Sequence, residues 1–240
     1  GNTILNTANY DIIDNLVYSY DTGNKLLKVE DNANNAQGFN NGNSGTNIDY
    51  SYDANGNMIT DANKGVTAIS YNYLNLPVQI TMQDGNINYT YDAAGVKQRK
   101  VVKGSTTDYA AGFQYENNVM QFFSQPEGYV RNNSGVYEYI YQYKDHLGNV
   151  RLSYNKNLNI IEENNYYPFG LEQKSHPNII STLGNAIAQN YKYNGKELQD
   201  ELGLNVYDYG FRLYDPAIGR MQNPDPLAEL AYDLTPNRYC

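Results

Sequence analysis

A short unit built on two tyrosines recurs through the first hundred residues, and this repeat constrains the fold more than any other feature of the chain. Two tyrosines separated by one residue are followed by an aspartate and a Gly-containing turn. Clear copies begin at Tyr18, Tyr50 and Tyr89, and a degenerate copy without the aspartate begins at Tyr71. The second tyrosines stand at positions 20, 52, 73 and 91. Such a repeat predicts a structure made by stacking one hairpin unit on the next.

The gaps between these second tyrosines are 32, 21 and 18 residues. The first gap contains an Asn/Gly-rich stretch, residues 31–47, which we interpret as an inserted loop. Without about a dozen of these residues, the period is near twenty throughout, as expected for a stacked hairpin unit.

The chemistry of the unit explains its composition. Alternating side chains of a strand point to opposite faces, so both tyrosines of a unit share one face and can stack on rings of the next hairpin. The aspartate is expected to cap the turn by accepting backbone N–H bonds, and Gly to take the position with positive φ. A calcium site of the glycine-aspartate repeat type would require a denser nonapeptide period, so we interpret these aspartates as turn formers.

The composition agrees with an all-β protein. The 240 residues include 26 Tyr, 20 Gly and no Trp, a mixture that favours strands and tight turns. A net charge of −9 argues against a nucleic-acid partner, which would require a basic surface. No apolar run reaches the length of a membrane-spanning helix.

Further tyrosine-rich strands are predicted after the repeats. Residues 111–123 and 136–143 read as strands, with Tyr137, Tyr139, Tyr141 and Tyr143 on one face, and a turn at 145–149 leads into a return strand at 150–154. Residues 179–189 could form a short helix, and residues 227–232 a helical turn. In residues 191–227, Tyr191 with Tyr193, and Tyr207 with Tyr209 and Phe211, each predict a short strand.

Residues 212–226 carry the most specific motif of the chain. They read R-x-Y-D-P-x-x-G-R-x-x-x-P-D-P, with Arg212, Tyr214, Asp215, Gly219 and Asp225 in that frame. This run resembles the core of the RHS (YD-repeat) family. The tyrosine-aspartate repeats, the KDHLGNVRLSY segment at 144–154 and the NNYYPFGL segment at 164–171 are similar to that family as well.

The resemblance implies a fold and a role. In the family, the repeats form a continuous antiparallel sheet that spirals into a hollow shell around a C-terminal toxin or other cargo of the same polypeptide. It therefore implies a secreted or surface-delivered bacterial protein, with further shell or secretion components as possible partners. On this basis we expect residues 1–16 to be a polar N-terminal segment, residues 17–110 to be YD-repeat hairpins, and residues 111–240 to be the RHS-associated core segment, all in one continuous structure.

The resemblance also implies a candidate catalytic site. The family's core is similar to an intramolecular aspartyl protease that releases the polypeptide after it, and its arginine and first aspartate match Arg212 and Asp225. The second aspartate of the family lies in a later D-P-x-G sequence, which does not occur before Cys240. We therefore expect the chain as it stands to be non-catalytic. In a longer chain that includes the downstream sequence, the same region could be an aspartic-type autoprotease. The structural alternative is that Arg212, Asp215 and Asp225 pair with one another and cap turns.

Other chemistry finds little support in the sequence. His146, His176 and Cys240 are too few and too scattered for a zinc site or for a thiol with a base, so no metal and no cofactor are expected. A third function remains open, in which rows of exposed tyrosines bind carbohydrate or a cell-surface partner. Inward-facing tyrosines that stack between repeats would explain the same residues.

Overall fold

The computed structural model describes residues 12–33, 36–42, 48–173, 181, 183–230 and 235–237. His176, Cys240 and parts of the predicted N-terminal segment and of the loop at 31–47 lie outside the described residues. Nineteen strands in three antiparallel sheets form the described part, together with one α-helix and three 3-10 helices of three or four residues each. The expected all-β fold is confirmed.

The largest sheet has thirteen strands that follow one another in strict sequence order, each antiparallel to the next. We call this sheet the wall. Its strands are β3 (Tyr50–Tyr52), β4 (Met58–Asp61), β5 (Val66–Tyr71), β6 (Pro77–Met82), β7 (Gly85–Tyr91), β8 (Lys97–Val102), β9 (Ser105–Ala110), β10 (Phe113–Glu116), β11 (Val119–Gln125), β12 (Gly128–Asn133), β13 (Val136–Lys144), β14 (Val150–Asn155) and β15 (Ile160–Glu163). β1 (Leu16–Tyr20) and β2 (Leu26–Asp31) form a separate hairpin beside β3.

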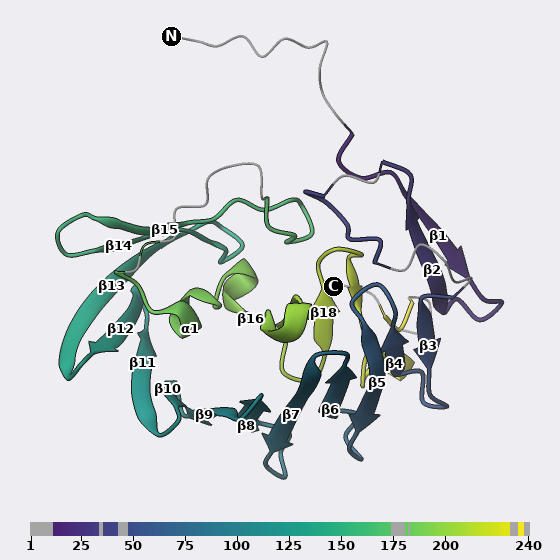
Figure 1. The fold of residues 1–240 in the computed structure, drawn as a ribbon, viewed down its shortest axis with the longest axis horizontal. Helices are drawn as coiled ribbons and strands as arrows, with labels where there is room; N and C mark the ends of the chain where they lie inside the picture. Colours follow the sequence, from purple (N-terminus) through teal and green to yellow (C-terminus); the bar gives the residue numbers. More distant parts are fainter. Residues whose placement is uncertain are drawn as a thin grey trace, which may run out of the picture.

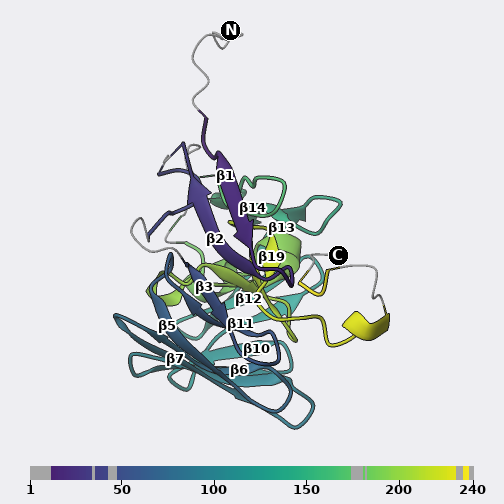
Figure 2. The same ribbon diagram turned by 90° about the vertical axis from the view of Figure 1, so that its right-hand side faces the viewer.

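The wall curves into an arc, and the chain after it returns to the concave side (Figure 1). We call residues 186–221 the inner segment. It contains α1 (Ala186–Gln189), β16 (Glu197–Gln199), β17 (Val206–Asp208), β18 (Leu213–Asp215) and β19 (Arg220–Met221), with 3-10 turns at Tyr193–Gly195 and Glu201–Gly203. A last 3-10 turn at Ala228–Leu230 lies within the predicted helical turn at 227–232, and α1 lies within the predicted window 179–189. Seen from the side, the inner segment lies between the wall and the β1–β2 hairpin (Figure 2).

The hydrophobic core consists of contacts between the inner segment and the sheets around it. Leu204, Val206 and Leu213 pack against buried residues of β5–β7. Ala188 of α1 packs against Phe122, Tyr129, Ile140 and Ile161 of β11–β15, and Ile218 packs against β2, β3 and β4. Each fully buried Leu, Ile or Val contributes about 1.5–3 kcal/mol through removal of its surface from water. The inner segment is therefore the apolar filling of the arc.

Six turns of the chain share one geometry. In each, the side-chain Oδ1 atom of an Asp or Asn accepts the backbone N–H groups two and four residues later at 2.7–3.1 Å, and the residue three positions later has a φ of 58–86°. The six acceptors are Asp21, Asp53, Asn72, Asp92, Asp145 and Asn155. The predicted capping role of the repeat aspartates is confirmed. Because Asn72 and Asn155 do the same work without a charge, the turn requires an oxygen acceptor and no cation.

This geometry corrects the frame of the degenerate repeat. Asn72 occupies the aspartate position, so Tyr71 corresponds to Tyr52 and Tyr91, whereas Tyr73 points outward with 81% exposure. The tyrosines before the turns then stand at 52, 71 and 91, separated by 19 and 20 residues.

The repeats are joined by hydrogen bonds from these tyrosines, where ring stacking was expected. The hydroxyls of Tyr52, Tyr71 and Tyr91 donate to the backbone carbonyls of Leu26, Met58 and Pro77 at 2.9, 2.6 and 3.0 Å. Each acceptor lies five residues after the capping Asp or Asn of the preceding unit. We call each such hydrogen bond a rung. Rings of the repeats stack within one strand, as do Tyr18 and Tyr20 at 6.5 Å between centroids.

Of two strand predictions in the inner segment, the one at Tyr191 and Tyr193 was wrong, and the one at Tyr207 to Phe211 was too long. Tyr193 begins a 3-10 turn, in which Asn194 has a φ of 51°, and Tyr191 makes only an isolated bridge to Glu197. β17 ends at Asp208, so Tyr207 is buried while Phe211 is 55% exposed. Period-two spacing failed here because Gly195 and Gly210, both with positive φ, place turns between or beside the rings.

Candidate functional site

The structure brings Arg212 and Asp225 together. Arg212 Nη2 lies 3.4 Å from Asp225 Oδ2, and both side chains are partly buried, at 11% and 22% exposure. Asp225 also accepts the Leu227 N–H at 2.9 Å, and its own N–H donates to the Pro236 carbonyl at 2.8 Å. The turn after the Pro-Asp-Pro run therefore holds the carboxylate in place beside the guanidinium.

The pair lies at a pocket of about 430 Å³ with mostly apolar walls. Tyr209, Phe211, Met221, Pro226 and Leu227 complete its lining. A carboxylate next to a guanidinium in such a pocket can position a polar group, but acid–base catalysis by a carboxylate pair needs a second carboxyl group. Among the described residues that line this pocket, Asp225 is the one carboxylate.

Asp215 does not join Arg212 and Asp225. Its Oδ2 atom lies 2.8 Å from Lys64 Nζ, the side chain is 1% exposed, and its Oδ1 atom caps the turn at Ala217. Lys64 Nζ also donates to the carbonyls of Leu204 and Asn205 at 3.0 and 3.2 Å. The structural alternative was that Arg212, Asp215 and Asp225 pair with one another and cap turns. Arg212 does pair with Asp225, and both aspartates cap turns, but Asp215 instead pairs with Lys64 and so connects the inner segment to the β4–β5 turn.

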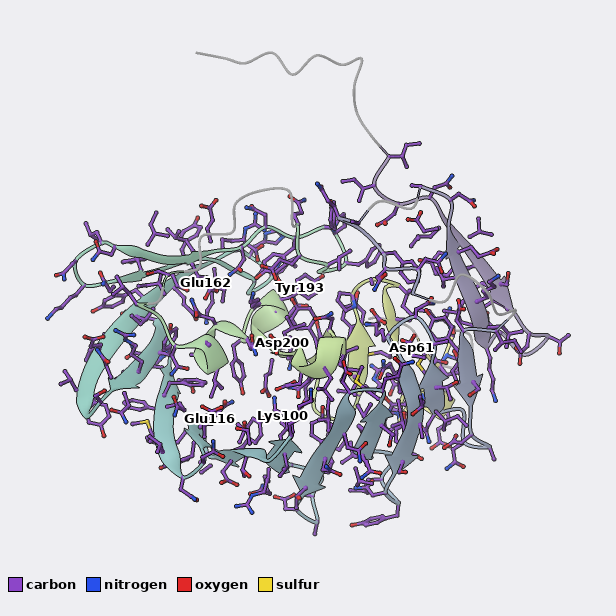
Figure 3. All side chains as sticks on the ribbon, viewed as in Figure 1. Asp61, Lys100, Glu116, Glu162, Tyr193 and Asp200 are labelled. Atoms are coloured by element: carbon purple, nitrogen blue, oxygen red, sulfur yellow. The ribbon has the colours of Figure 1, made fainter. Side chains whose placement is uncertain are left out.

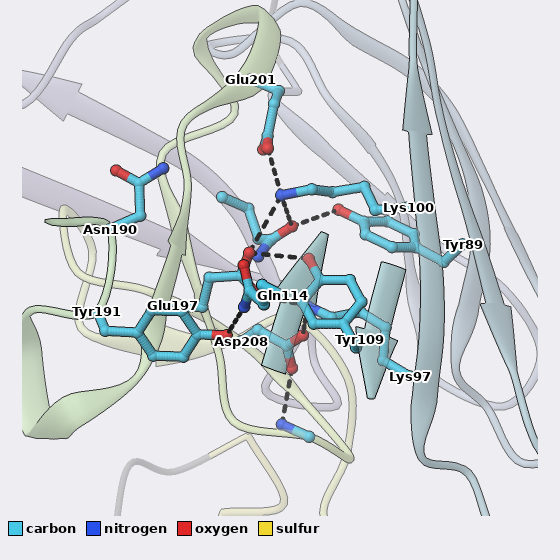
Figure 4. A network of polar contacts seen from close by, with 12 residues as sticks. Tyr89, Lys97, Lys100, Tyr109, Gln114, Asn190, Tyr191, Glu197, Glu201 and Asp208 are labelled. Carbon is cyan, nitrogen blue, oxygen red and sulfur yellow. Dashed lines mark hydrogen bonds and ion pairs between the residues drawn. The ribbon is translucent and has the colours of Figure 1, made fainter. Parts of the chain in front are cut away.

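A buried polar network fastens the inner segment to β8, and sequence reasoning did not find it (Figure 4). Lys97 Nζ contacts Glu197 and Asp208 at 2.7 and 2.5 Å, and Lys100 Nζ contacts Glu197 at 3.2 Å and also Glu201. Tyr109 donates to Glu197 at 2.8 Å. Burial alone would raise the pKa of Glu197, but the two ammonium groups outweigh it and lower that pKa to about 2. The network is buried and charged, and its ion pairs join β8 to the inner segment, which marks a structural connection.

Two other buried carboxyl groups have raised pKa values. Burial raises the pKa of Asp61 to about 7 against the opposing charge of Lys64, and Asp215 adds to the increase. Burial likewise raises the pKa of Glu162 to about 7, opposed by its hydrogen bond from Asn164. Both side chains lie on the concave side of the wall, facing the inner segment (Figure 3).

Three tyrosines of the inner segment hold the NNYYPFGL segment. Tyr193, Tyr214 and Tyr207 donate to the successive carbonyls of Pro168, Phe169 and Gly170 at 3.2, 2.9 and 3.5 Å. Tyr207 and Tyr214 are 1% and 0% exposed. These tyrosines are internal donors, which explains why the chain uses Tyr where a plain apolar core would use Phe.

The other candidates occupy ordinary places. His146 is exposed in the turn at 145–149. Among the described residues, no group of three or more His, Cys, Asp or Glu side chains is placed to hold a metal ion. No helix in the described ranges has the length and apolar character needed to cross a membrane.

Comparison with solved structures shows the same fold in large toxin complexes. The crystal structure of TcdB2-TccC3 superposes with a TM-score of 0.63 and 21% identity over 93% of this chain. The Tc holotoxin pore of Photorhabdus luminescens gives 0.62 and 20% over the same share. This chain covers only 13% and 12% of those chains. The likeness identifies the class of fold, a curved sheet wall of the kind found in Tc toxin chains.

Sequence comparison also finds a relative. Salivary gland surface protein 1 of Aedes aegypti is 27% identical over 212 residues, which is 75% of this chain and 6% of that protein. No family model matches the chain.

Proposed function

We propose that this chain is a non-catalytic structural piece of an RHS-type shell, belonging to a polymorphic toxin or a surface protein. The wall is a section of the shell, and the inner segment lies on its inside. In the longer protein the shell would enclose or present a C-terminal cargo of the same polypeptide, and the protein would be secreted or displayed on a bacterial surface. One observation carries the proposal: thirteen strands in strict sequence order curve around the segment that follows them.

The repeats support a shell because a sheet built from them can be extended by further units. Each unit caps its own turn and donates one tyrosine rung to the unit before it, so every unit contacts its neighbours in the same way. Repeat architectures of this type grow by addition of units and enclose space by curvature. The wall of this chain is itself filled by the inner segment, so a cargo would lie within walls formed elsewhere in the longer protein.

Protection of the following polypeptide tests this proposal. The protein extended by its native upstream and downstream sequence should shield the downstream part from proteinase K, while the same part expressed alone is digested. Equal digestion rates in both forms would contradict the shell. A stable fragment that spans β3 to the inner segment is expected in the digest of the extended protein.

The Arg212–Asp225 pair supports a second function, an intramolecular aspartyl protease of the longer chain. A downstream D-P-x-G aspartate that reached the pocket would face Asp225, which Arg212 and the turn at Leu227 hold in place. Two carboxylates held close together share one proton, so one can activate water while the other acts as the acid.

Intact mass of the protein extended through the next D-P-x-G sequence tests the protease. A cut at that sequence in the wild type and its loss in Asp225→Asn would support the protease. Asp200→Asn serves as the matched control, since Asp200 is an exposed acceptor for Asn190 in the same segment. An uncut wild type, or equal cutting in Asp225→Asn, leaves the pair as a structural contact.

A further inference from the structure

A separate pocket of about 330 Å³ lies where β1, residues 167–171 and the turn after β18 meet. Three aromatic side chains from two distant parts of the chain line it, namely Tyr18, Tyr167 and Phe169. Leu16, Pro168, Leu171, Pro216 and Ile218 supply further apolar surface. Neither the shell nor the protease uses this pocket.

Among the described residues that line the pocket, Asp14 is the one that carries a charge. Its Oδ1 atom accepts the Phe39 N–H at 2.7 Å, which fixes the carboxylate at the pocket. Burial raises the pKa of Tyr167, and the charge of Asp14 adds to the increase. Burial also raises the pKa of Tyr18; Tyr20, Asp215 and Asp14 add to that increase, and Arg220 opposes it.

Arg220, the residue after Gly219 of the lining, contacts Tyr20, which does not line the pocket. The Arg220 guanidinium lies 5.4 Å from the ring centroid of Tyr20 and donates to the Tyr20 hydroxyl at 3.3 Å. Phe169 rests against Gly219, where an added Cβ would lie 3.6 Å from Phe169 Cγ, and remains 58% exposed. The pocket is thus open to ligand, aromatic, and negatively charged.

We propose that this pocket binds a quaternary ammonium cation of the trimethylammonium type. Aromatic faces attract such a cation through their negative quadrupole, and a nearby carboxylate adds charge complementarity. A primary ammonium group would need several acceptors to replace its water, whereas methyl groups match the proline and leucine surface without any hydrogen bond. The binding is non-covalent, and the cation can come from free choline or from a choline lipid headgroup.

Titration calorimetry with choline chloride tests the proposal directly. Choline should bind saturably. The uncharged analogue 3,3-dimethyl-1-butanol, which has the same shape, should bind at least roughly tenfold more weakly, because it cannot form the cation–π interaction. Equal binding of both would reduce the pocket to an apolar cavity and overturn the proposal. Absence of choline binding would overturn it as well.

Variants assign the binding to this pocket. Phe169→Leu and Tyr167→Leu should each weaken choline binding about tenfold. Asp14→Asn should weaken it and flatten its salt dependence, while the amide oxygen can still accept the Phe39 N–H. Phe113→Leu, at a 42% exposed aromatic residue of the outer wall, is the matched control and should bind choline as the wild type does. Unchanged binding in all three pocket variants, each with a wild-type thermal midpoint, would contradict the assignment.

Vesicle flotation separates the two sources. Co-flotation with phosphatidylcholine vesicles that free choline displaces would assign a lipid headgroup. Binding of free choline without flotation would assign a small molecule. Both results support the cation site, and both are independent of the shell and the protease.

Discussion

The wall and the inner segment are held by different kinds of interaction. In the wall, contacts are local: a capping Asp or Asn closes each repeat turn, and a tyrosine rung joins each unit to the one before. The inner segment is fastened by partners 100 or more residues away, such as Lys97 with Glu197 and Lys64 with Asp215. The wall is therefore extendable by repetition, whereas the inner segment fits one place only.

The wall itself contains two kinds of hairpin. Four hairpins between β8 and β13 have two-residue turns with positive φ at both positions, and they lack the capping aspartate. These turns are Lys103-Gly104, Ala111-Gly112, Asn117-Asn118 and Ser134-Gly135. Type I′ turns of this kind match the twist of antiparallel strands without side-chain help. The sheet continues unbroken where the repeat is no longer visible in the sequence.

The largest expected effect breaks the attachment of the inner segment. Glu197→Gln removes the carboxylate shared by Lys97 and Lys100 and should lower the free energy of unfolding by about 3–5 kcal/mol, because it leaves buried ammonium groups short of charge. Urea unfolding measures this. Glu163→Gln, in β15 with no ion pair to the described residues, should change it by less than about 0.5 kcal/mol. If both variants lower the free energy of unfolding by a similar amount, the ion-pair network contributes no more to stability than Glu163 does.

The next effect depends on pH at the contact between wall and inner segment. The pKa of Glu162 is about 7 in the folded protein, above its ordinary value of 4.5, so the stabilisation is complete below pH 4.5 and is lost as pH rises to 7. The loss amounts to at most about 3 kcal/mol. Glu162→Gln, which mimics the protonated acid, should be more stable than the wild type above pH 7 and should approach it at pH 4.5. If the difference in unfolding free energy between Glu162→Gln and the wild type does not change with pH, no buried carboxyl group titrates at this position.

A smaller effect concerns the repeat turn of the wall. Asp53→Ala removes the acceptor of two backbone N–H groups and should cost about 1 kcal/mol, by analogy with helix caps. Asp53→Asn should cost less than about 0.5 kcal/mol, because Asn72 forms the same turn natively. Thermal unfolding of both variants compares them, and equal destabilisation would mean that the charge matters.

The smallest effect tests one rung. Tyr91→Phe removes the hydroxyl that donates to the Pro77 carbonyl and should cost about 1 kcal/mol or slightly less. Tyr139→Phe, at a 54% exposed ring of β13, is the matched control and should be neutral. If both substitutions are neutral in urea unfolding, the rungs do not stabilise the wall.

Sequence reasoning succeeded where structure is local. The alternation of Tyr, the capping Asp and the Gly turn predicted hairpins and turn chemistry, because both are decided within a few residues. It missed the role of Asn72, because an amide and a carboxylate were not treated as equivalent acceptors. It could not find Lys100 or Glu197, since two single charges on distant strands carry no pattern until the fold brings them together. The Arg212–Asp225 proximity came from the resemblance, and its catalytic role stays a prediction.

The inner segment spans the arc. Within one stretch of chain, Ala188 packs against β11–β15, Val206 packs against β5–β7, and Ile218 packs against β3 and β4 at the other end of the wall and against β2 beyond it. Because this stretch makes buried contacts with strands at both ends of the wall, it connects the two ends across the concave side. A force that flattens the wall would have to break those buried contacts first.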